Sequence, residues 1–543
     1  MSISDYYKGQ VSESMKMESM KFVSTIICFL ILATSFAQQD PQWDTTKKNE
    51  WPKECQVVRI PSTMDNEQQS AIFYAATKEN SPLVVSLHTW SGDFTQKDTL
   101  VFDCIKKNYN YIHPNFRGPN KTFKATGSNY VIQDIEDAIA YAIEHGKVDI
   151  NNIHVVGTSG GGHATLLTYM NTKYPVKTFS AWVPISDIKK WYYESEGRSN
   201  KYALDIASST VKESNFNSNN YYLGEAEAIE RSPFYMKTPV ENRKKSKLFL
   251  YAGIHDGYTG SVPITQSLDF YNKIVSSFDS LETAALVPQK DIIEMLTSRN
   301  FSSKVKDSIA GRLVHYKKTY RDLMKITIFE GTHECLTSVA LNQVTGNKIL
   351  AIGDSNGAHK NGWVNQLKKT NFKDFVYNTS ISGNTIGFDN LDQPKLNTLK
   401  NIDSYITKAN EHLGGIDKIT IMLGTNDCKA VFDNRKNEVP QNMNSLLQKI
   451  KAHPVYLKHK PKIFVVSPPP TGEDHMMKEK YHGASKKVKW LRKKFKKIAK
   501  VNNCKYIDIY TTLAPKWSSL SKDGIHPEEE GQLLMSKMID KQM

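Results

Sequence analysis

The sequence predicts an α/β protein with two domains, and three features of the chain lead to this fold class. Short apolar runs alternate with helical patterns from residue 57 onward, as in a parallel sheet with crossover helices. A strand, a turn carrying a serine and a helix follow one another twice, around Ser159 and around Ser355. The chain has 543 residues, which is more than one domain usually holds. We expect one domain at residues 52–345 and a second at residues 347–543.

Composition excludes several classes of protein. The mean hydropathy is −0.49 and the chain contains a single long apolar run, which excludes a protein with many membrane spans. Aromatic residues make up 10% of the chain, a share that argues against disorder. Only 6 cysteines are present, too few for a fold held by disulfides, and they show no metal-binding spacing.

The N-terminal segment resembles an export signal. An apolar run at residues 22–33 follows Lys21 and precedes the small residues Ser35 and Ala37, which suit a signal peptidase. We predict a signal peptide at residues 1–37 that includes an upstream extension, with a retained membrane anchor as the alternative. The mature chain would then be secreted or periplasmic and would carry no integral membrane span.

The first domain contains the elements of a serine hydrolase. We expect its strands at the apolar runs 83–87, 153–156, 247–251 and 326–329. A G-x-S-x-G turn follows the second of these runs and exposes Ser159 as the candidate nucleophile. Asp256 and His333 follow the third and fourth runs, in the Ser, Asp, His order of such enzymes. His255 is a rival base, but it precedes the last strand.

The expected oxyanion hole combines the backbone N–H of Gly160 with that of Trp90 or Ser91. Together with the sequences LHTWSGD, GTSGGG, AGIHDGYTGSVP and FEGTHE, this arrangement resembles the prolyl oligopeptidase-type branch of the alpha/beta-hydrolase superfamily. Peptidases of that branch usually carry a β-propeller, for which the segment before residue 83 is too short. The domain is therefore also similar to secreted esterases, and the choice between ester and amide substrates stays open. An aromatic-rich insertion at residues 186–243 is expected to form a lid, and a second insertion at 277–323 is expected to be helical.

The second domain begins with the strand and turn KILAIGDSNG, which places Ser355 at the end of a strand. Three later sequences, NTSISGNT, ITIMLGTND and KDGIHPEEEG, complete a resemblance to the SGNH (GDSL-type) hydrolase family over residues 347–543. The resemblance implies a flavodoxin-like, three-layer α/β/α fold. In the implied site, Ser355 attacks, His526 moves the proton and Asp523 orients the imidazole. The backbone N–H groups of Ser355 and Gly383 and the side chain of Asn426 would bind the oxyanion.

The net charge of +15 is concentrated at residues 478–500, which contain eleven Lys or Arg and one Glu. Apolar residues recur in this segment at helical spacing. One interpretation is an amphipathic surface helix with a solvated basic face, and the other is a surface that binds an acidic polysaccharide or a cell surface.

These features together predict a secreted esterase with two independent Ser-His-Asp sites that need no cofactor and no metal. The expected partner is an acylated polysaccharide or oligosaccharide of plant or algal origin, and no nucleic acid. Acetyl groups are the groups we favour as those removed, with methyl and feruloyl esters as further candidates. A peptidase activity of the first domain, and a non-catalytic carbohydrate-binding role for one domain, remain as alternatives. The sequence leaves the oligomeric state open.

Overall fold

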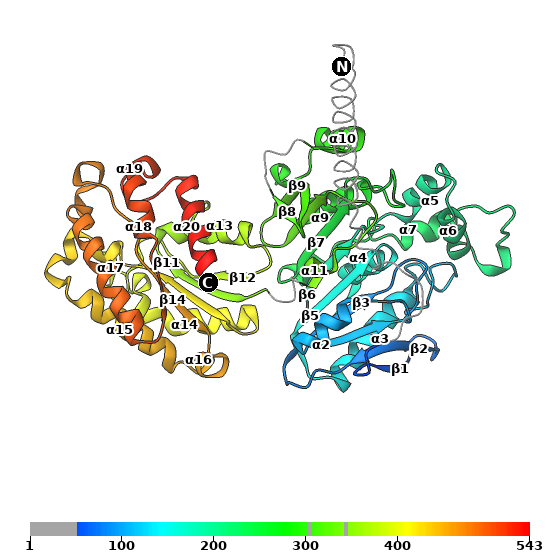
Figure 1. Cartoon of the computed structure of the whole chain (residues 1–543), viewed down its shortest axis with the longest axis horizontal. Helices are drawn as coiled ribbons and strands as arrows, with labels where there is room; N and C mark the ends of the chain where they lie inside the picture. Colours follow the sequence, from blue (N-terminus) through cyan, green and yellow to red (C-terminus); the bar gives the residue numbers. More distant parts are fainter. Residues whose placement is uncertain (1–50, 302–306, 342–345) are drawn as a thin grey trace, which may run out of the picture.

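The computed structural model of the protein describes residues 51–301, 307–341 and 346–543. These residues form two α/β bodies that lie side by side, one on each side of the join near residue 345 (Figure 1). The predicted fold class of two α/β domains is therefore confirmed. The predicted signal peptide lies outside the described residues. Within the described part of the chain, no helix has both the length and the apolar composition that a membrane crossing requires.

The first domain is built around a 10-stranded mixed sheet with the order β1-β2-β4-β3-β5-β6-β7-β10-β9-β8. Its central strands β4, β3, β5, β6, β7 and β10 run parallel, and antiparallel strands extend both edges. The strands are β1 (Gln56–Pro61), β2 (Gln68–Tyr74), β3 (Ser81–Leu87), β4 (Asn110–Pro114), β5 (Val148–Thr158), β6 (Val176–Trp182), β7 (Lys247–Gly253), β8 (Ser308–Ile309), β9 (Arg312–Tyr320) and β10 (Met324–Phe329).

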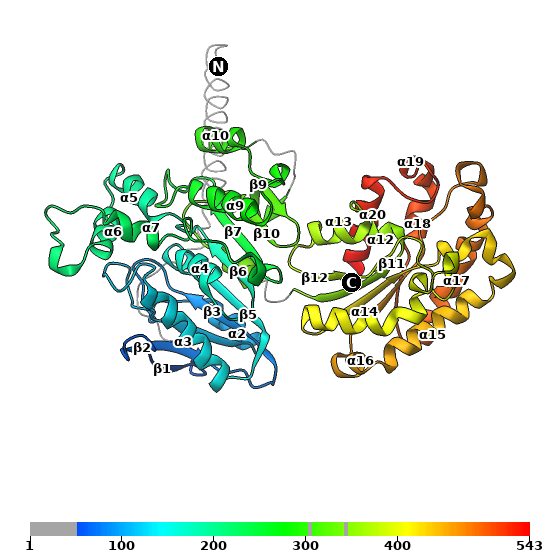
Figure 2. The ribbon, with the colours of Figure 1, turned by 180° about the vertical axis from the view of Figure 1, so that it is seen from behind.

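Apolar side chains on both faces of this sheet are buried under helices. Successive residues of β3 point to opposite faces, so that Val84 joins one apolar core while Leu83 and Val85 join the other. The core around Leu83 is covered by α3 (Asn129–His145), α4 (Gly160–Asn171) and α9 (Thr265–Phe278). The core around Val84 is covered by α2 (Leu100–Lys107) and α11 (Thr337–Ala340). Figure 2 shows the first set of helices in front of the strands.

The first insertion contains four short α-helices and a small core of its own. They are α5 (Ile188–Glu196), α6 (Tyr202–Thr210), α7 (Glu225–Glu230) and α8 (Val240–Arg243). Trp191 and Ile206 are fully buried and pack with Trp90, so the insertion covers the loop that carries a candidate oxyanion residue. Other aromatic side chains are exposed, including Tyr222 at 55%.

The second insertion differs from the prediction. It contains the helix α10 (Gln289–Ser298), but its second half contains the strands β8 and β9, and β9 pairs antiparallel with β10. Val314 and Tyr316, two residues apart in β9, both pack inward. The expectation of an entirely helical insertion was therefore wrong, because β9 extends the sheet and buries its apolar side chains there.

The second domain has a 5-stranded parallel sheet with the order β12-β11-β13-β14-β15. Counted within the domain this order is 2-1-3-4-5, the flavodoxin-like arrangement predicted. Separate apolar cores on the two faces make three layers. The strands are β11 (Lys348–Gly353), β12 (Phe375–Asn378), β13 (Lys418–Met422), β14 (Lys462–Val466) and β15 (Lys505–Ile507). The α-helices are α12 (Ser355–Ala358), α13 (Trp363–Thr370), α14 (Thr398–Leu413), α15 (Glu438–Ala452), α16 (Pro454–His459), α17 (Ala484–Val501), α18 (Tyr510–Leu513), α19 (Trp517–Leu520) and α20 (Glu529–Gln542).

Candidate functional site

Ser159 occupies a sharp turn between β5 and α4. Its φ of +56° lies in a region that residues with side chains rarely adopt. A Cβ atom on Gly157 would lie 2.1 Å from the carbonyl oxygen of Gly161, and one on Gly161 would lie 2.1 Å from that of Leu87. Neither position therefore tolerates a side chain, which explains the glycines on both sides of the serine. The turn places Ser159 at the carboxyl end of the sheet.

Asp256 and His333 lie together at the ends of two neighbouring strands, β7 and β10. The Nδ1 of His333 is 2.8 Å from Oδ2 of Asp256. The other carboxylate oxygen accepts hydrogen bonds from the backbone N–H groups of Gly257 and Val262, at 2.9 and 3.0 Å. The carboxylate is thus fixed by the loop that follows it, and it holds the imidazole with the proton on Nδ1 and the base at Nε2.

His255, the rival base, makes different contacts. Its Nε2 is 2.8 Å from Oε1 of Glu330, whose other oxygen is 2.7 Å from Nε2 of His315. The structure therefore brings His333, and not His255, to the candidate acid.

Two candidate oxyanion residues of the first domain, Gly160 and Trp90, have backbones in close contact. A Cβ atom on Gly160 would lie 2.5 Å from both N and Cα of Trp90. Ser91 instead accepts a hydrogen bond from Lys201 Nζ on its hydroxyl oxygen, at 2.7 Å. Of the two alternatives, Trp90 is the one whose backbone nitrogen lies against Gly160.

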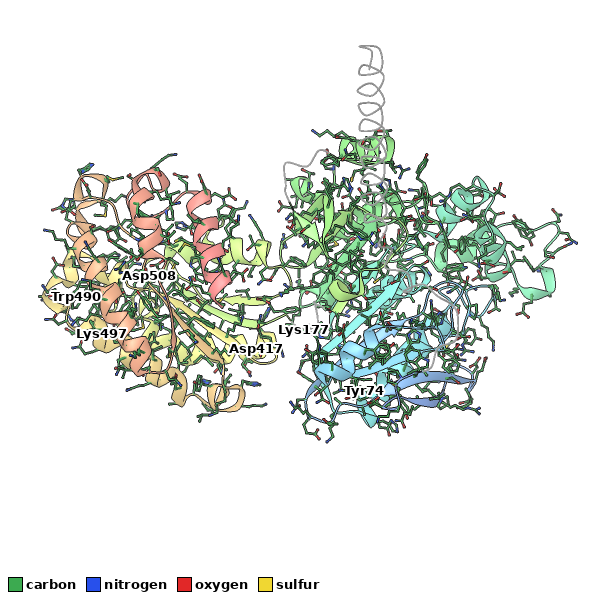
Figure 3. All side chains as sticks on the ribbon, viewed as in Figure 1. Tyr74, Lys177, Asp417, Trp490, Lys497 and Asp508 are labelled. Carbon is green, nitrogen blue, oxygen red and sulfur yellow. The ribbon has the colours of Figure 1, made fainter. Side chains whose placement is uncertain are left out.

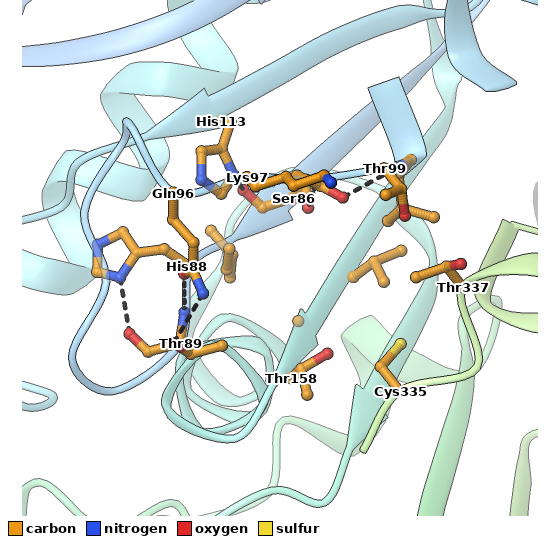
Figure 4. A pocket seen from close by; sticks show the side chains of 15 residues that line it. Ser86, His88, Thr89, Gln96, Lys97, Thr99, His113, Thr158, Cys335 and Thr337 are labelled. Atoms are coloured by element: carbon orange, nitrogen blue, oxygen red, sulfur yellow. Dashed lines mark hydrogen bonds between the residues drawn. The ribbon is translucent and has the colours of Figure 1, made fainter. Parts of the chain in front are cut away.

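The loop of Trp90 is held in place by Gln96, which lines a small pocket next to it (Figure 4). The side chain of Gln96 accepts a hydrogen bond from the backbone N–H of Thr89 at 2.8 Å and donates one to its hydroxyl at 3.0 Å. The pocket has a volume of about 40 Å³, which admits water and no larger ligand. We assign it a supporting role for the loop.

His333 opens onto a wide cleft of about 570 Å³ beneath the first insertion. Tyr202, Tyr258 and Arg198 line it together with several small polar residues. The guanidinium of Arg198 donates hydrogen bonds to the carbonyl oxygens of Gly260 and Ser261 at 3.1 and 2.7 Å. Arg198 follows α5, so it ties the insertion to the loop after Asp256. This residue was not identified from the sequence.

In the second domain the three candidate catalytic residues form an unbroken chain of contacts. Ser355 Oγ lies 2.8 Å from Nε2 of His526, and Nδ1 of His526 lies 2.7 Å from Oδ2 of Asp523. The second oxygen of Asp523 accepts the backbone N–H groups of Ile525 and His526 at 2.9 and 2.7 Å. Partial burial raises the pKa of Asp523, but the bonds from His526 outweigh it and lower the pKa below its usual value. The carboxylate is therefore ionised at neutral pH.

The candidate oxyanion residues of this domain are held by side chains that lie behind them. Asn426 donates one amide hydrogen to the carbonyl oxygen of Asn384 at 3.1 Å, while its Oδ1 accepts the hydroxyl of Tyr481 at 2.9 Å. Both contacts fix the amide and leave its second hydrogen for a ligand. Gly383 has a φ of +87°, and its carbonyl oxygen accepts a hydrogen bond from the side chain of Asn390 at 2.6 Å.

Lys429 connects these two supports. Its Nζ donates to Oδ1 of Asn390 at 3.2 Å and lies 5.6 Å from the ring centre of Tyr481. Burial lowers the pKa of Lys429 to about 8. Tyr481, Asn390 and Lys429 were not identified from the sequence. Of these three residues, only Lys429 lies close in sequence to a predicted site residue, three positions after Asn426.

Two carboxyl groups are buried beside this site. Asp354 accepts the backbone N–H of Asn356 at 3.0 Å, which supports the first turn after the strand, and Asp427 accepts that of Ile386 at 3.0 Å. Burial raises the pKa of Asp354 to about 6 and that of Asp427 to about 7. Both groups serve the turns that carry the candidate site and contact neither Ser355 nor His526 through a hydrogen bond in the described residues.

Comparison with solved structures finds partial similarity for each domain. The acylaminoacyl peptidase of Pyrococcus horikoshii is 19% identical over 43% of this chain and 36% of its own length, with a TM-score of 0.33. A carbohydrate acetylesterase family member from Sinorhizobium meliloti is 20% identical over 36% of this chain and 95% of its own, with a TM-score of 0.30. The aryl esterase of M. smegmatis is 23% identical over 36% of this chain and 99% of its own, with a TM-score of 0.29. This chain thus spans about a third of the peptidase.

Comparison with sequence families identifies both domains. No curated protein matches the sequence. Residues 98–286 match the model of the prolyl oligopeptidase family, and residues 348–534 match that of the GDSL-like lipase/acylhydrolase family. The chain therefore carries a prolyl oligopeptidase-type α/β-hydrolase domain followed by a GDSL-type hydrolase domain.

Proposed function

We propose that this protein is a secreted esterase with two independent serine sites that removes acetyl groups from polysaccharides of plants or algae. The contact chain from Ser355 through His526 to Asp523 is the observation that carries the proposal. It supplies a nucleophile, a base within hydrogen-bond reach and a carboxylate that orients the base.

At the second site the proposed reaction proceeds in two halves. Ser355 Oγ attacks the carbonyl carbon of the ester and passes its proton to Nε2 of His526, while Asp523 stabilises the imidazolium. The bond to the sugar oxygen then breaks, and His526 returns the proton to that oxygen. Water attacks the acetyl-serine by the same steps and releases acetate. Gly383 N–H and the free amide hydrogen of Asn426 bind the oxyanion, and one such donor is worth about 10²–10³ in rate.

At the first site the same chemistry is assigned to Ser159, His333 and Asp256. The Asp256 and His333 contact of 2.8 Å orients the base, and the backbone N–H groups of Gly160 and Trp90 would receive the oxyanion. The wide, polar cleft next to His333 suits a bulky hydrophilic substrate better than a small apolar ester.

The substrate class is inferred from the pairing of domains. Two unrelated serine hydrolase domains in one chain are useful if a single polymer carries several kinds of acyl ester. Export, which rests on the signal sequence before residue 38, would bring the enzyme to such polymers. Methyl and feruloyl esters remain candidates for one of the two sites.

The proposal is tested by acetate release from acetylated xylan, mannan and pectin. We compare the wild type with Ser159→Ala, Ser355→Ala and the double variant. Loss of a different set of products in each single variant would support two separate esterase sites. If Ser159→Ala changes no product, the first domain has another role, either as the peptidase considered below or as a non-catalytic sugar-binding module. If the wild type releases nothing, the polysaccharide proposal fails.

A peptidase activity of the first domain is the second candidate function, because residues 98–286 match the prolyl oligopeptidase family. The triad chemistry is the same for amides and esters. Cleavage of acylated peptides that Ser159→Ala abolishes would establish this activity. Turnover of esters alone would exclude it.

A further inference from the structure

The helix α17 presents a continuous basic face to solvent. Its apolar residues, among them Val488, Leu491 and Phe495, are buried in the core of the second domain. On the opposite side, seven lysines are exposed, and none has a carboxylate oxygen within 4.0 Å among the described residues. These lysines are Lys486, Lys489, Lys493, Lys494, Lys496, Lys497 and Lys500.

The other two basic residues of the helix are used differently. Lys487 forms an ion pair with Asp433, and Arg492 lies 3.8 Å from Asp508. Both are only partly exposed and border the buried face. The ion pairs that support the fold therefore involve the border of the helix, and the exposed lysines have no carboxylate partner among the described residues.

An aromatic ring lies within the basic face. Trp490 is partly exposed, and Lys494 Nζ lies 5.5 Å from the centre of its ring system. Lys486, Trp490, Lys493 and Lys497 follow one another at spacings of three and four residues, which places them in one row along the helix. Figure 3 shows Trp490 and Lys497 on the side of the second domain that faces away from the first. The row from Lys486 to Lys497 is about 17 Å long, and ammonium groups with an aromatic ring among them match an extended ligand with negative charges and apolar ring faces.

The beginning of α17 lies next to the second candidate site. Tyr481, three residues before the helix, holds the amide of Asn426. Further along, the ring of Phe495 packs against the loop of Asn426, because a Cβ atom on Gly424 would lie 3.2 Å from it. The start of α17, where the basic face begins, therefore lies near the oxyanion side of the Ser355 site.

We propose that the basic face of α17 binds an anionic polysaccharide, of the polyuronate class, and presents its esters to Ser355. This inference rests on the proposed esterase function and narrows its substrate. An unpaired row of charges attracts a polyanion over several ångströms and raises its local concentration. A lipid surface fits less well, because Val488, Leu491 and Phe495 are buried in the core. The exposed Val501 and the partly exposed Trp490 form no continuous apolar face that could enter a bilayer.

The test compares two triple variants with equal loss of charge. The surface variant is Lys489→Gln, Lys493→Gln and Lys497→Gln. The matched control changes three other exposed lysines of the same domain that have no ion pair among the described residues, namely Lys395→Gln, Lys408→Gln and Lys458→Gln. Both are made in the Ser159→Ala background, so that the second site alone is measured. Binding is measured with de-esterified polygalacturonate in affinity electrophoresis, and activity with acetylated polygalacturonate, acetylated mannan and 4-nitrophenyl acetate.

We expect the surface variant to bind polygalacturonate at least about tenfold more weakly and to show a KM raised by a similar factor for its acetylated form. Turnover of 4-nitrophenyl acetate and of acetylated mannan should not change. In about 1 M salt, where charges are screened within about 3 Å, the difference should disappear.

Unchanged binding in the surface variant, or an equal loss in the control, would overturn the inference. Retention of anionic vesicles or of DNA by α17 without retention of polygalacturonate would also overturn it. A failure of the proposed esterase function gives a different result from a failure of this inference. In that case α17-dependent binding persists, but the wild type releases no acetate from any acetylated glycan.

Discussion

The Nζ of Lys247 donates a hydrogen bond of 2.8 Å to the carbonyl oxygen of Phe372, and this bond joins the two domains. The same nitrogen donates to the carbonyl oxygen of Asp374, also at 2.8 Å. Lys247 begins β7 of the first sheet, and Phe372 follows α13 of the second domain. The Phe372 ring packs edge-on against Phe249, with centroids 5.1 Å apart. A buried lysine and an aromatic pair therefore fasten the second domain to a central strand of the first.

Lys247→Met should loosen this junction. The substitution removes the donor for two buried carbonyl oxygens, and unsatisfied groups of this kind cost about 1–3 kcal/mol. We expect a free energy of unfolding lower by about 2 kcal/mol, measured by denaturant unfolding. Lys245→Met, an exposed position two residues earlier, is the matched control and should change little.

The pH dependence of the free energy of unfolding provides a second test of the contribution of Lys247. Burial lowers the pKa of Lys247 to about 8, whereas unfolded lysine titrates near 10.4. Between these values the unfolded chain binds more protons, so Lys247 makes the stability of the wild type rise with pH over this interval. The Met variant lacks this contribution, so the wild-type advantage should grow from pH 8 upward. Parallel curves for the two proteins would contradict the assignment.

Tyr481→Phe should slow the second site without unfolding it. The change removes the hydroxyl that fixes Asn426 and keeps the ring in place. We expect kcat for 4-nitrophenyl acetate to fall by about tenfold or more with little change in KM, since the oxyanion forms only during the reaction. Tyr405→Phe is the control, because its buried hydroxyl has no hydrogen-bond partner among the described residues. Equal effects of the two changes would show that Tyr481 acts through packing alone.

Arg198→Met should affect the first site selectively. Without the bonds from Arg198 to Gly260 and Ser261, the loop that holds Asp256 keeps the hydrogen bond from Trp191 Nε1 to the carbonyl oxygen of Ser261 but loses its contacts with the guanidinium. We expect an activity loss of about tenfold to a hundredfold at this site, measured in the Ser355→Ala background. The activity of the second site, measured in the Ser159→Ala background, is the internal control. A loss at both sites would indicate general destabilisation.

The parts of the fold that local sequence encodes could be predicted, and those that depend on distant segments could not. Buried strands such as β3 and β5 are continuous apolar runs, and the glycines around Ser159 are required by the turn itself. Asp523 and His526 share one loop. The strand β9 was missed, because His315, Lys317 and Lys318 interrupt its apolar residues, which are buried where the strand pairs with β10.

The supports of both candidate sites were missed for the same reason. Tyr481 reaches Asn426 across 55 positions of the chain, and Arg198 reaches the loop after Asp256 from a separate insertion. Neither contact leaves a pattern of spacing in its own segment. The choice between Trp90 and Ser91 also needed coordinates, since it depends on which backbone nitrogen lies against Gly160.

Asp523→Asn should disable the second site by moving the imidazole proton of His526 from Nδ1 to Nε2, while the side chains stay in place. The amide oxygen can still accept the two backbone N–H groups that Oδ1 accepts now, so the NH₂ group faces Nδ1 of His526. The imidazole must then accept at Nδ1 and carry its proton on Nε2, opposite Ser355, where it cannot take the serine proton. We expect kcat at neutral pH to fall by about 10³–10⁴, with binding of the substrate preserved. Ester turnover by the first domain in the same variant shows that the protein is folded. A loss smaller than tenfold would mean that the bond between Asp523 and His526 does not set the protonation of the base.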